Sequence, residues 1–185
     1  SNKSSDSFVF LRTELNLTAD QLAKLDKALL SVTATSPEST RQFVYNMYVN
    51  GTIVGVGPSR YGKTPAGKNE LFYNTYDVTA LLKSGDNCLS TINYTTAGRA
   101  FLSQLTLHYT DGTSEVVSNS ARDAEKWTSL AADKVFGKNN SIGTNYYLAH
   151  ANNINSALYP YGFAEASFDD SAWNGVFVGD PIQTG

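Results

Sequence analysis

Apolar and more polar residues alternate over many short stretches of this chain, and that alternation limits the fold more than any other feature of the sequence. The stretch FVYNMYV would place Phe43, Tyr45, Met47 and Val49 on one face of a strand, because successive strand side chains point to opposite faces. An Asn-Gly pair follows, which is the strongest short signal for a hairpin, and TIVGVG returns as the partner strand. The pattern predicts antiparallel strands joined by tight turns.

Similar alternation elsewhere predicts further short strands. They are expected at residues 8–17, 28–35, 43–49, 52–57, 70–76, 87–95, 101–110 and 113–118. Regular turns separate these strands, and the sequence contains no long amphipathic helix. The fold class that we expect is therefore all-β, an antiparallel β-sandwich of the jelly-roll kind with one or two short helical turns.

The first expected strand has one face predicted to be buried, formed by Val9, Leu11, Thr13, Leu15 and Leu17. Between the strands, residues 58–69 are expected to form a loop. From residue 120 onward the periodicity weakens, so we expect loops and edge strands there, with ARDAEKW fitting one helical turn.

Two further segments have the features of short helical turns. TADQLAKLDKA places Thr and Gln in capping-box spacing, which predicts a short helix after the first strand. In YNTYDVTALLKSGDN, Asp77 or Thr79 can cap the first free N–H groups, Leu81 and Leu82 would face the core, and a Ser-Gly pair ends the turn.

The composition excludes several classes of partner. The formal net charge is −3 and only 17% of residues are charged, which leaves no basic surface for nucleic acid or an anionic membrane. No segment approaches the roughly 18 continuous apolar residues of a membrane span. Cys88, the only cysteine, is interpreted as a core residue, and His108 and His150 lack a third metal ligand. We expect no nucleic-acid partner, no membrane insertion and no metal.

The length of 185 residues fits one domain with a sizeable core. We expect residues 1–7 to be a disordered or vector-derived tail and residues 8–185 to form a single β-sandwich domain.

The order of the motifs resembles a known family. YVNG, VGVGPSR, YNTYDVTALLKSGDN, LTLHYTDGT and FDDSAW occur in sequence order over roughly residues 8–176, as in the N-terminal β-sandwich of bacterial α-L-rhamnosidases. The resemblance implies a galactose-binding-like fold in which DVTALL closes one end of the core. It also implies that the chemistry lies in a separate (α/α)6 barrel that follows in the chain. We therefore expect a non-catalytic fragment of a larger glycosidase, located in the periplasm or outside the cell.

The carboxylates of this chain are poor candidates for catalysis. An inverting glycosidase needs two carboxyl groups roughly 6.5–9.5 Å apart in a cleft. Asp169 and Asp170 are adjacent, so on a strand they would point to opposite faces, and in a loop they more often cap a turn. No catalytic residue is predicted.

Relatives that bind rhamnose with calcium commonly have a PGWTDY-like loop, whereas this chain has GPSRYGKTPAGKN without the Trp and Asp. A second family segment, G-E-x-Y-D-A-R, is matched here by GTNYYLA, which keeps Gly143 and Tyr146 but has Tyr147 and Ala149 at the acid and arginine positions. The family permits calcium, but its usual loop is not matched, and no cofactor is expected.

Sugar binding is the remaining functional candidate. The tracts NYYLAHANN and LYPYGF combine aromatic rings, which can stack on a pyranose, with amides, which can bond its hydroxyls. The predicted carbohydrate-binding residues are Tyr146, Tyr147, Asn152, Asn153, Tyr159 and Tyr161. The chain would then help a downstream catalytic domain engage rhamnose-containing glycans. The alternative is a structural domain that buttresses the barrel and binds no sugar.

Overall fold

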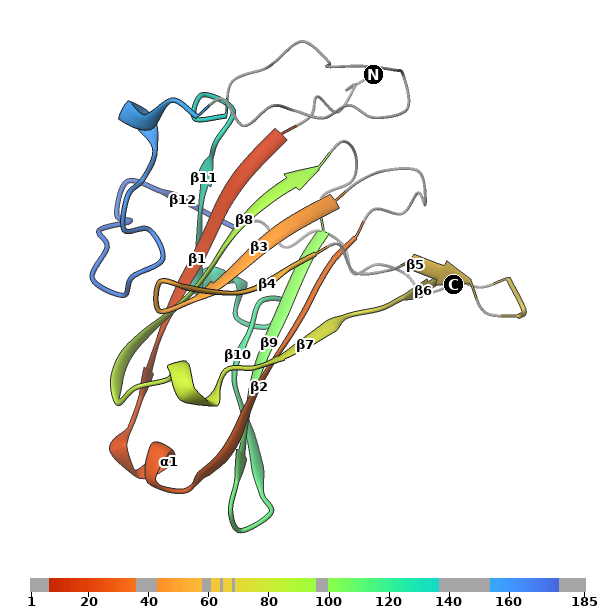
Figure 1. The fold of residues 1–185 in the computed structure, drawn as a ribbon, viewed down its shortest axis with the longest axis vertical. Helices are drawn as coiled ribbons and strands as arrows, with labels where there is room; N and C mark the ends of the chain where they lie inside the picture. The colour runs from red at the N-terminus through yellow and green to blue at the C-terminus, as the bar shows by residue number, and fades with distance from the viewer. Residues whose placement is uncertain are drawn as a thin grey trace.

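The computed structural model describes residues 7–35, 43–57, 61–63, 65–67, 69–95, 100–136 and 154–176. Its strands, labelled in Figure 1, are β1 (Ser7–Leu17), β2 (Leu25–Thr35), β3 (Phe43–Val49), β4 (Thr52–Val56), β5 (Tyr61–Lys63), β6 (Asn69–Leu71), β7 (Asn74–Asp77), β8 (Gly85–Thr95), β9 (Ala100–Tyr109), β10 (Ser114–Asn119), β11 (Trp127–Ala131) and β12 (Asn174–Gly175). One short helix, α1 (Ala19–Ala23), follows β1, and 3₁₀ turns span Thr79–Leu81, Ala124–Lys126 and Ser156–Leu158.

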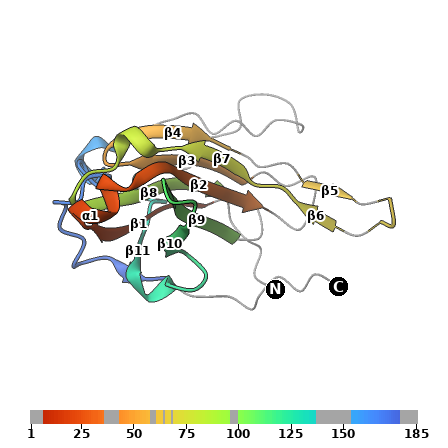
Figure 2. The ribbon, with the colours of Figure 1, turned by 90° about the horizontal axis from the view of Figure 1, so that it is seen from below.

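Two antiparallel sheets form a sandwich. The six-stranded sheet has the order β12-β11-β1-β8-β3-β4, and the four-stranded sheet has the order β10-β9-β2-β7. Neighbours such as β1 and β8 are far apart in the chain, so connections cross between the sheets as in a jelly roll. In Figure 2, α1 lies at one end of the sandwich and the β5–β6 hairpin extends from the other. The predicted all-β sandwich is confirmed.

The core lies between the sheets and follows the period-two pattern. Along β2, Ala28, Leu30, Val32 and Ala34 are fully buried or nearly so, while the residues between them face outward. On the facing sheet, Tyr45, Met47 and Val49 of β3 are 0% exposed, as the sequence predicted. The other members of the core come from β1, β8, β9 and β11, together with Val78 just after β7, so most of the main elements contribute to one cluster.

The first strand is buried on both faces, which corrects the prediction of a single buried face. Thr13 and Leu17 face the core, but Phe10 and Arg12 on the opposite face are also 0% exposed. The cause is a distant segment, residues 154–176, which covers the outer face of the six-stranded sheet and packs against Phe10.

The Asn-Gly hairpin is confirmed between β3 and β4. Asn50 has a φ of 47° and Gly51 a φ of 80°, as a two-residue type I′ turn requires. The segment expected to be a loop at residues 58–69 instead contains β5 and the start of β6, which pair with each other. The glycines and prolines of this segment are typical of loops, which is why the short hairpin was not predicted. The strand expected at residues 70–76 is divided between β6 and β7.

The expected helical turns form at their predicted places. At α1, the Gln21 N–H donates to the Thr18 hydroxyl at 3.1 Å and the Thr18 N–H donates to Gln21 Oε1 at 2.8 Å, which completes the capping box. In the turn after β7, the Thr79 N–H donates to Asp77 Oδ1 at 3.0 Å. Leu81 packs against the core behind it.

The described residues after position 120, 121–136 and 154–176, contain more regular structure than expected. ARDAEKW forms the predicted helical turn at Ala124–Lys126, but β11 is not an edge strand, because it lies between β1 and β12 and buries Trp127. Within the described part of the chain, none of the helices is long and apolar enough to cross a membrane.

Candidate functional site

The candidate site lies on residues 154–176, the segment that covers the outer face of the six-stranded sheet. Its backbone is a series of tight turns, with Phe163 N–H donating to the Pro160 carbonyl at 3.0 Å and Gly162 at a φ of 85°. It is also joined to the β3–β4 hairpin, because the Gly51 N–H donates to the Ala164 carbonyl at 2.9 Å. A second apolar cluster fills the space beneath the segment, formed by Phe10, Ala132, Val135, Phe163 and Ala164.

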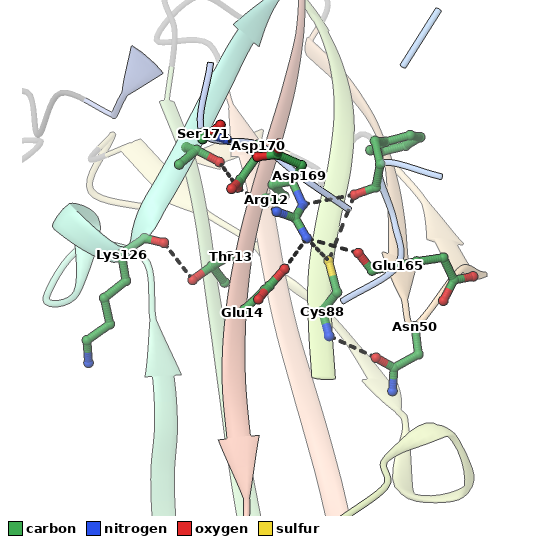
Figure 3. A network of polar contacts seen from close by, with 12 residues as sticks. Arg12, Thr13, Glu14, Asn50, Cys88, Lys126, Glu165, Asp169, Asp170 and Ser171 are labelled. Atoms are coloured by element: carbon green, nitrogen blue, oxygen red, sulfur yellow. Dashed lines mark hydrogen bonds and ion pairs between the residues drawn. The ribbon is translucent and has the colours of Figure 1, made fainter. Parts of the chain in front are cut away.

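A buried arginine anchors this segment to β1. Arg12 Nε donates to the Phe163 carbonyl at 3.0 Å, and one terminal nitrogen donates to the Glu165 carbonyl at 2.9 Å (Figure 3). The other terminal nitrogen lies 2.5 Å from Asp170 Oδ2. Since the Arg12 side chain is 0% exposed, these contacts compensate its loss of hydration. Burial by itself would lower the pKa of Arg12, but hydrogen bonds to Glu14 and Asp170 raise it.

The two adjacent aspartates have structural partners. Besides the Arg12 ion pair, Asp170 Oδ2 accepts a hydrogen bond from the Thr128 hydroxyl at 2.7 Å. Asp169 Oδ1 accepts from the Ser171 N–H at 3.0 Å and so caps a turn, and bonds from Ser171 lower the pKa of Asp169. One aspartate therefore caps a turn as expected, and its neighbour forms an ion pair that the sequence did not indicate.

Cys88 lies beside the anchor. Its Sγ is 3.7 Å from an Arg12 terminal nitrogen and 3.9 Å from the Phe163 carbonyl oxygen, and the residue is fully buried. Burial raises the pKa of the Cys88 thiol to about 11, and the nearby Arg12 charge offsets this only in part. The interpretation of Cys88 as a buried core residue is confirmed.

Tyr159 and Tyr161 are the predicted sugar contacts that fall within the described residues. The Tyr159 ring packs edge-on against Phe10, with centroids 5.5 Å apart at 85°, and against Phe163 at 6.2 Å. Tyr161 is 69% exposed and lies 5.0 Å from Tyr159. Tyr159 is therefore a half-buried packing residue, and Tyr161 is the ring available for stacking.

The other predicted contacts are not placed. Tyr146, Tyr147, Asn152 and Asn153 lie outside the described residues. The nearby Asn155 uses its side-chain oxygen to accept from the Ala157 N–H at 3.2 Å, so it stabilises the 3₁₀ turn. The structure thus brings together two of the six predicted residues.

The sequence pattern did not predict the role of Arg12, because its partners Phe163 and Glu165 lie 151 and 153 positions away. A signal was available: Phe8, Phe10 and Arg12 occupy alternate positions, which marks a second apolar face interrupted by one cation. Among the described residues, no group of three or more His, Cys, Asp or Glu side chains is placed to hold a metal ion. The absence of a cofactor stays a prediction.

Comparisons with known proteins relate both the sequence and the fold to one family. The family model for the α-L-rhamnosidase N-terminal domain matches residues 39–183. A search of curated protein sequences found no match.

Three solved structures share the fold. The α-L-rhamnosidase from Dictyoglumus thermophilum has a TM-score of 0.64 at 16% identity, with 95% of this chain and 18% of that chain covered. The Streptomyces avermitilis α-L-rhamnosidase complexed with L-rhamnose has a TM-score of 0.62 at 23% identity, with 95% and 16% covered. The α-L-rhamnosidase from Aspergillus terreus has a TM-score of 0.61 at 18% identity, with 95% and 19% covered. This chain spans less than a fifth of each of them.

Proposed function

The chain belongs to the α-L-rhamnosidase N-terminal domain family, and from this we propose that it is the non-catalytic N-terminal module of a larger α-L-rhamnosidase-like glycoside hydrolase. Its role in that enzyme is to assist recognition of rhamnose-containing glycans, and its main partner is the catalytic domain of the same polypeptide. The small share of each structural neighbour that the chain covers supports an accessory role.

The state of the carboxylates supports a role without catalysis. Asp77, Asp111 and Asp169 each accept bonds from a Thr or Ser two residues later, and these bonds lower the pKa of each carboxyl. The pKa of Asp123 is also lowered, chiefly by its hydrogen bond with Arg122. A general acid in a glycosidase needs a raised carboxyl pKa so that it stays protonated near neutral pH. These four groups have the opposite shift.

The observation that carries the recognition role is the exposed ring of Tyr161 on an anchored segment. Arg12 holds the backbone at Phe163, two residues away, so the ring is presented from a fixed position. A pre-positioned aromatic ring can stack on a sugar with little loss of entropy. Leu158, 48% exposed, belongs to the same segment and adds apolar surface.

A specific observation favours the alternative, a domain that only buttresses the catalytic barrel. Ile53 and Val56 on the edge strand β4 are 51% and 61% exposed, which is unusual for two large apolar residues on one short strand. An edge strand with apolar side chains suits packing against another domain. Recognition and buttressing make different predictions for an isolated chain.

The test is an NMR titration of the isotope-labelled chain with L-rhamnose, with and without calcium. Recognition predicts shifts of Tyr161 and Gly162 signals with a Kd on the order of 1 mM, because a small site yields about 4 kcal/mol. Tyr161→Ala should remove these shifts. The matched control is Val56→Ala, since Val56 is 61% exposed but lies on the edge strand β4, outside the segment that carries Tyr161. The absence of any shift from the sugar would favour the buttress.

A further inference from the structure

A shallow groove lies on the outer face of the four-stranded sheet, on the opposite side of the sandwich from residues 154–176. It holds about 400 Å³, within the range of about 300–1,000 Å³ typical of small-ligand sites. It crosses the adjacent strands β2, β9 and β10, which Figure 1 shows side by side. The side chains that matter for its chemistry are Ser31, Thr33, Tyr73, Leu102, Gln104 and Asn119.

The strand pattern explains why these side chains face outward. In β2, Leu30 and Val32 are buried in the core, so Ser31 and Thr33 between them point away from it. The register pairs Ser31 with Gln104 of β9, and Gln104 in turn lies opposite the end of β10. Hydroxyl and amide groups thus form a row across three strands on one face.

The amides of this row are held in fixed positions. Asn119 Nδ2 donates to Gln104 Oε1 at 2.8 Å, and Gln104 Nε2 donates to the Thr106 hydroxyl at 3.2 Å. Asn119 Oδ1 also accepts from the N–H groups of Ala121 and Arg122, each at 3.0 Å. Each side-chain NH₂ has two donors, so a second N–H remains available for a ligand. The polar groups need little reordering on binding, which lowers its entropic cost.

An aromatic ring borders the polar row. Tyr73 is 66% exposed, and the neighbouring Phe72 is 48% exposed. The Thr33 hydroxyl donates to the Phe72 carbonyl at 2.8 Å, which fixes the backbone next to Tyr73. Leu102, 39% exposed, adds an apolar contact on β9. This combination suits a pyranose, which offers an apolar face for stacking and hydroxyls for hydrogen bonds.

Among the described residues, those that line the groove are all uncharged. Nucleic acid or a phosphate ligand would require basic side chains, and a protein partner would require a larger apolar centre. We propose that this groove binds a neutral oligosaccharide, with Tyr73 stacking on one sugar ring and Gln104 and Asn119 bonding the hydroxyls of the chain. The proposal rests on the proposed glycan-recognition role and goes beyond it, because it assigns a second surface that is independent of Tyr161.

The experiment is an NMR titration of the labelled 185-residue chain with a neutral tetrasaccharide of α-linked L-rhamnose. The backbone and side-chain amide signals of Gln104 and Asn119 should shift. Tyr73→Ala should weaken the affinity read at these signals about fivefold, since one aromatic contact is worth about 1 kcal/mol. Leu102→Asp should weaken it as well. Tyr161→Ala, an equally exposed tyrosine on the opposite side, should leave these shifts unchanged within twofold.

Each outcome separates this proposal from the role on which it rests. Shifts confined to the neighbourhood of Tyr161 would overturn the groove while keeping glycan recognition. No shift anywhere with the tetrasaccharide would overturn both. A Tyr73→Ala variant that folds and keeps full affinity at the Gln104 and Asn119 signals would also overturn the groove.

Discussion

The Arg12 guanidinium donates a 3.0 Å hydrogen bond to the carbonyl of Phe163, a residue 151 positions later in the chain. This bond joins the first strand of the sandwich to the aromatic segment that covers it. Because Arg12 is fully buried, its charge is compensated by this carbonyl, by that of Glu165 and by the carboxylates of Glu14 and Asp170. The position of Tyr161 therefore depends on a residue near the other end of the chain.

Arg12→Met should lower the free energy of unfolding by about 3–5 kcal/mol, because it leaves Asp170 and two backbone carbonyls without their buried partner. Urea unfolding measures the loss. The matched control is Arg122→Met, since the Arg122 side chain is 59% exposed and solvent screens its pair with Asp123. Equal effects of the two substitutions would contradict the anchoring role.

Cys88 should be inert towards thiol reagents in the folded protein. Its burial raises the thiol pKa to about 11, so almost no thiolate exists at pH 8, and the side chain is inaccessible. Ellman's reagent should label Cys88 only after the chain is unfolded in urea. Rapid labelling of the native protein would show that the segment over Cys88 opens.

Gly55→Ala should destabilise the fold by about 1–3 kcal/mol, because an added methyl group would overlap the Tyr76 ring, whose nearest atom lies 2.1 Å from the new Cβ. The ring has little room to move, since the Tyr76 hydroxyl is 2.8 Å from that of Tyr45. Gly175→Ala is the control, since nothing lies within 4 Å of its Cβ position. The melting temperatures of the Gly55→Ala and Gly175→Ala variants are compared. Similar values would show that the Tyr76 ring is free to shift.

Thr79→Val should lower the free energy of unfolding by about 1–2 kcal/mol. The N–H of the buried residue Ala28 would lose its hydrogen-bond acceptor, the Thr79 hydroxyl at 2.8 Å. The substitution should also raise the pKa of Asp77, which hydrogen bonds from Thr79 hold below the ordinary 3.8. A group with a lowered folded pKa stabilises the protein above its unfolded pKa and loses that contribution as pH falls through the folded value. In the parent protein, the contribution of Asp77 to the free energy of unfolding should therefore decrease as the pH falls below roughly 3.8. In the variant, this contribution should already be smaller at higher pH. An unchanged Asp77 titration, followed by NMR, would contradict this.

The fold could be predicted from the sequence wherever it depends on contacts between near neighbours or on a pattern that repeats every two residues. The Asn50-Gly51 turn, the Thr18–Gln21 capping box and the alternating face of β3 each depend on a few neighbouring residues. The β5–β6 hairpin was missed because it is short and glycine-rich, and its pairing lies outside the two main sheets.

The candidate site was harder to predict from the sequence, because it depends on contacts between distant parts of the chain. The sequence indicated Tyr159 and Tyr161, but only the packing of Tyr159 against Phe10 shows that it is largely buried. The groove combines residues from β2, β9 and β10 with Tyr73, and its composition emerges only once the register aligns them. No local motif marks such a surface.

Recognition without catalysis can be followed in a single NMR experiment. The labelled chain is incubated for a day with an α-L-rhamnosyl oligosaccharide, and the protein and sugar signals are followed in the same NMR sample. The protein signals should shift with a Kd on the order of 1 mM while the sugar stays intact. Release of free L-rhamnose that a single Asp→Asn substitution abolishes, or protein signals that never move, would contradict it.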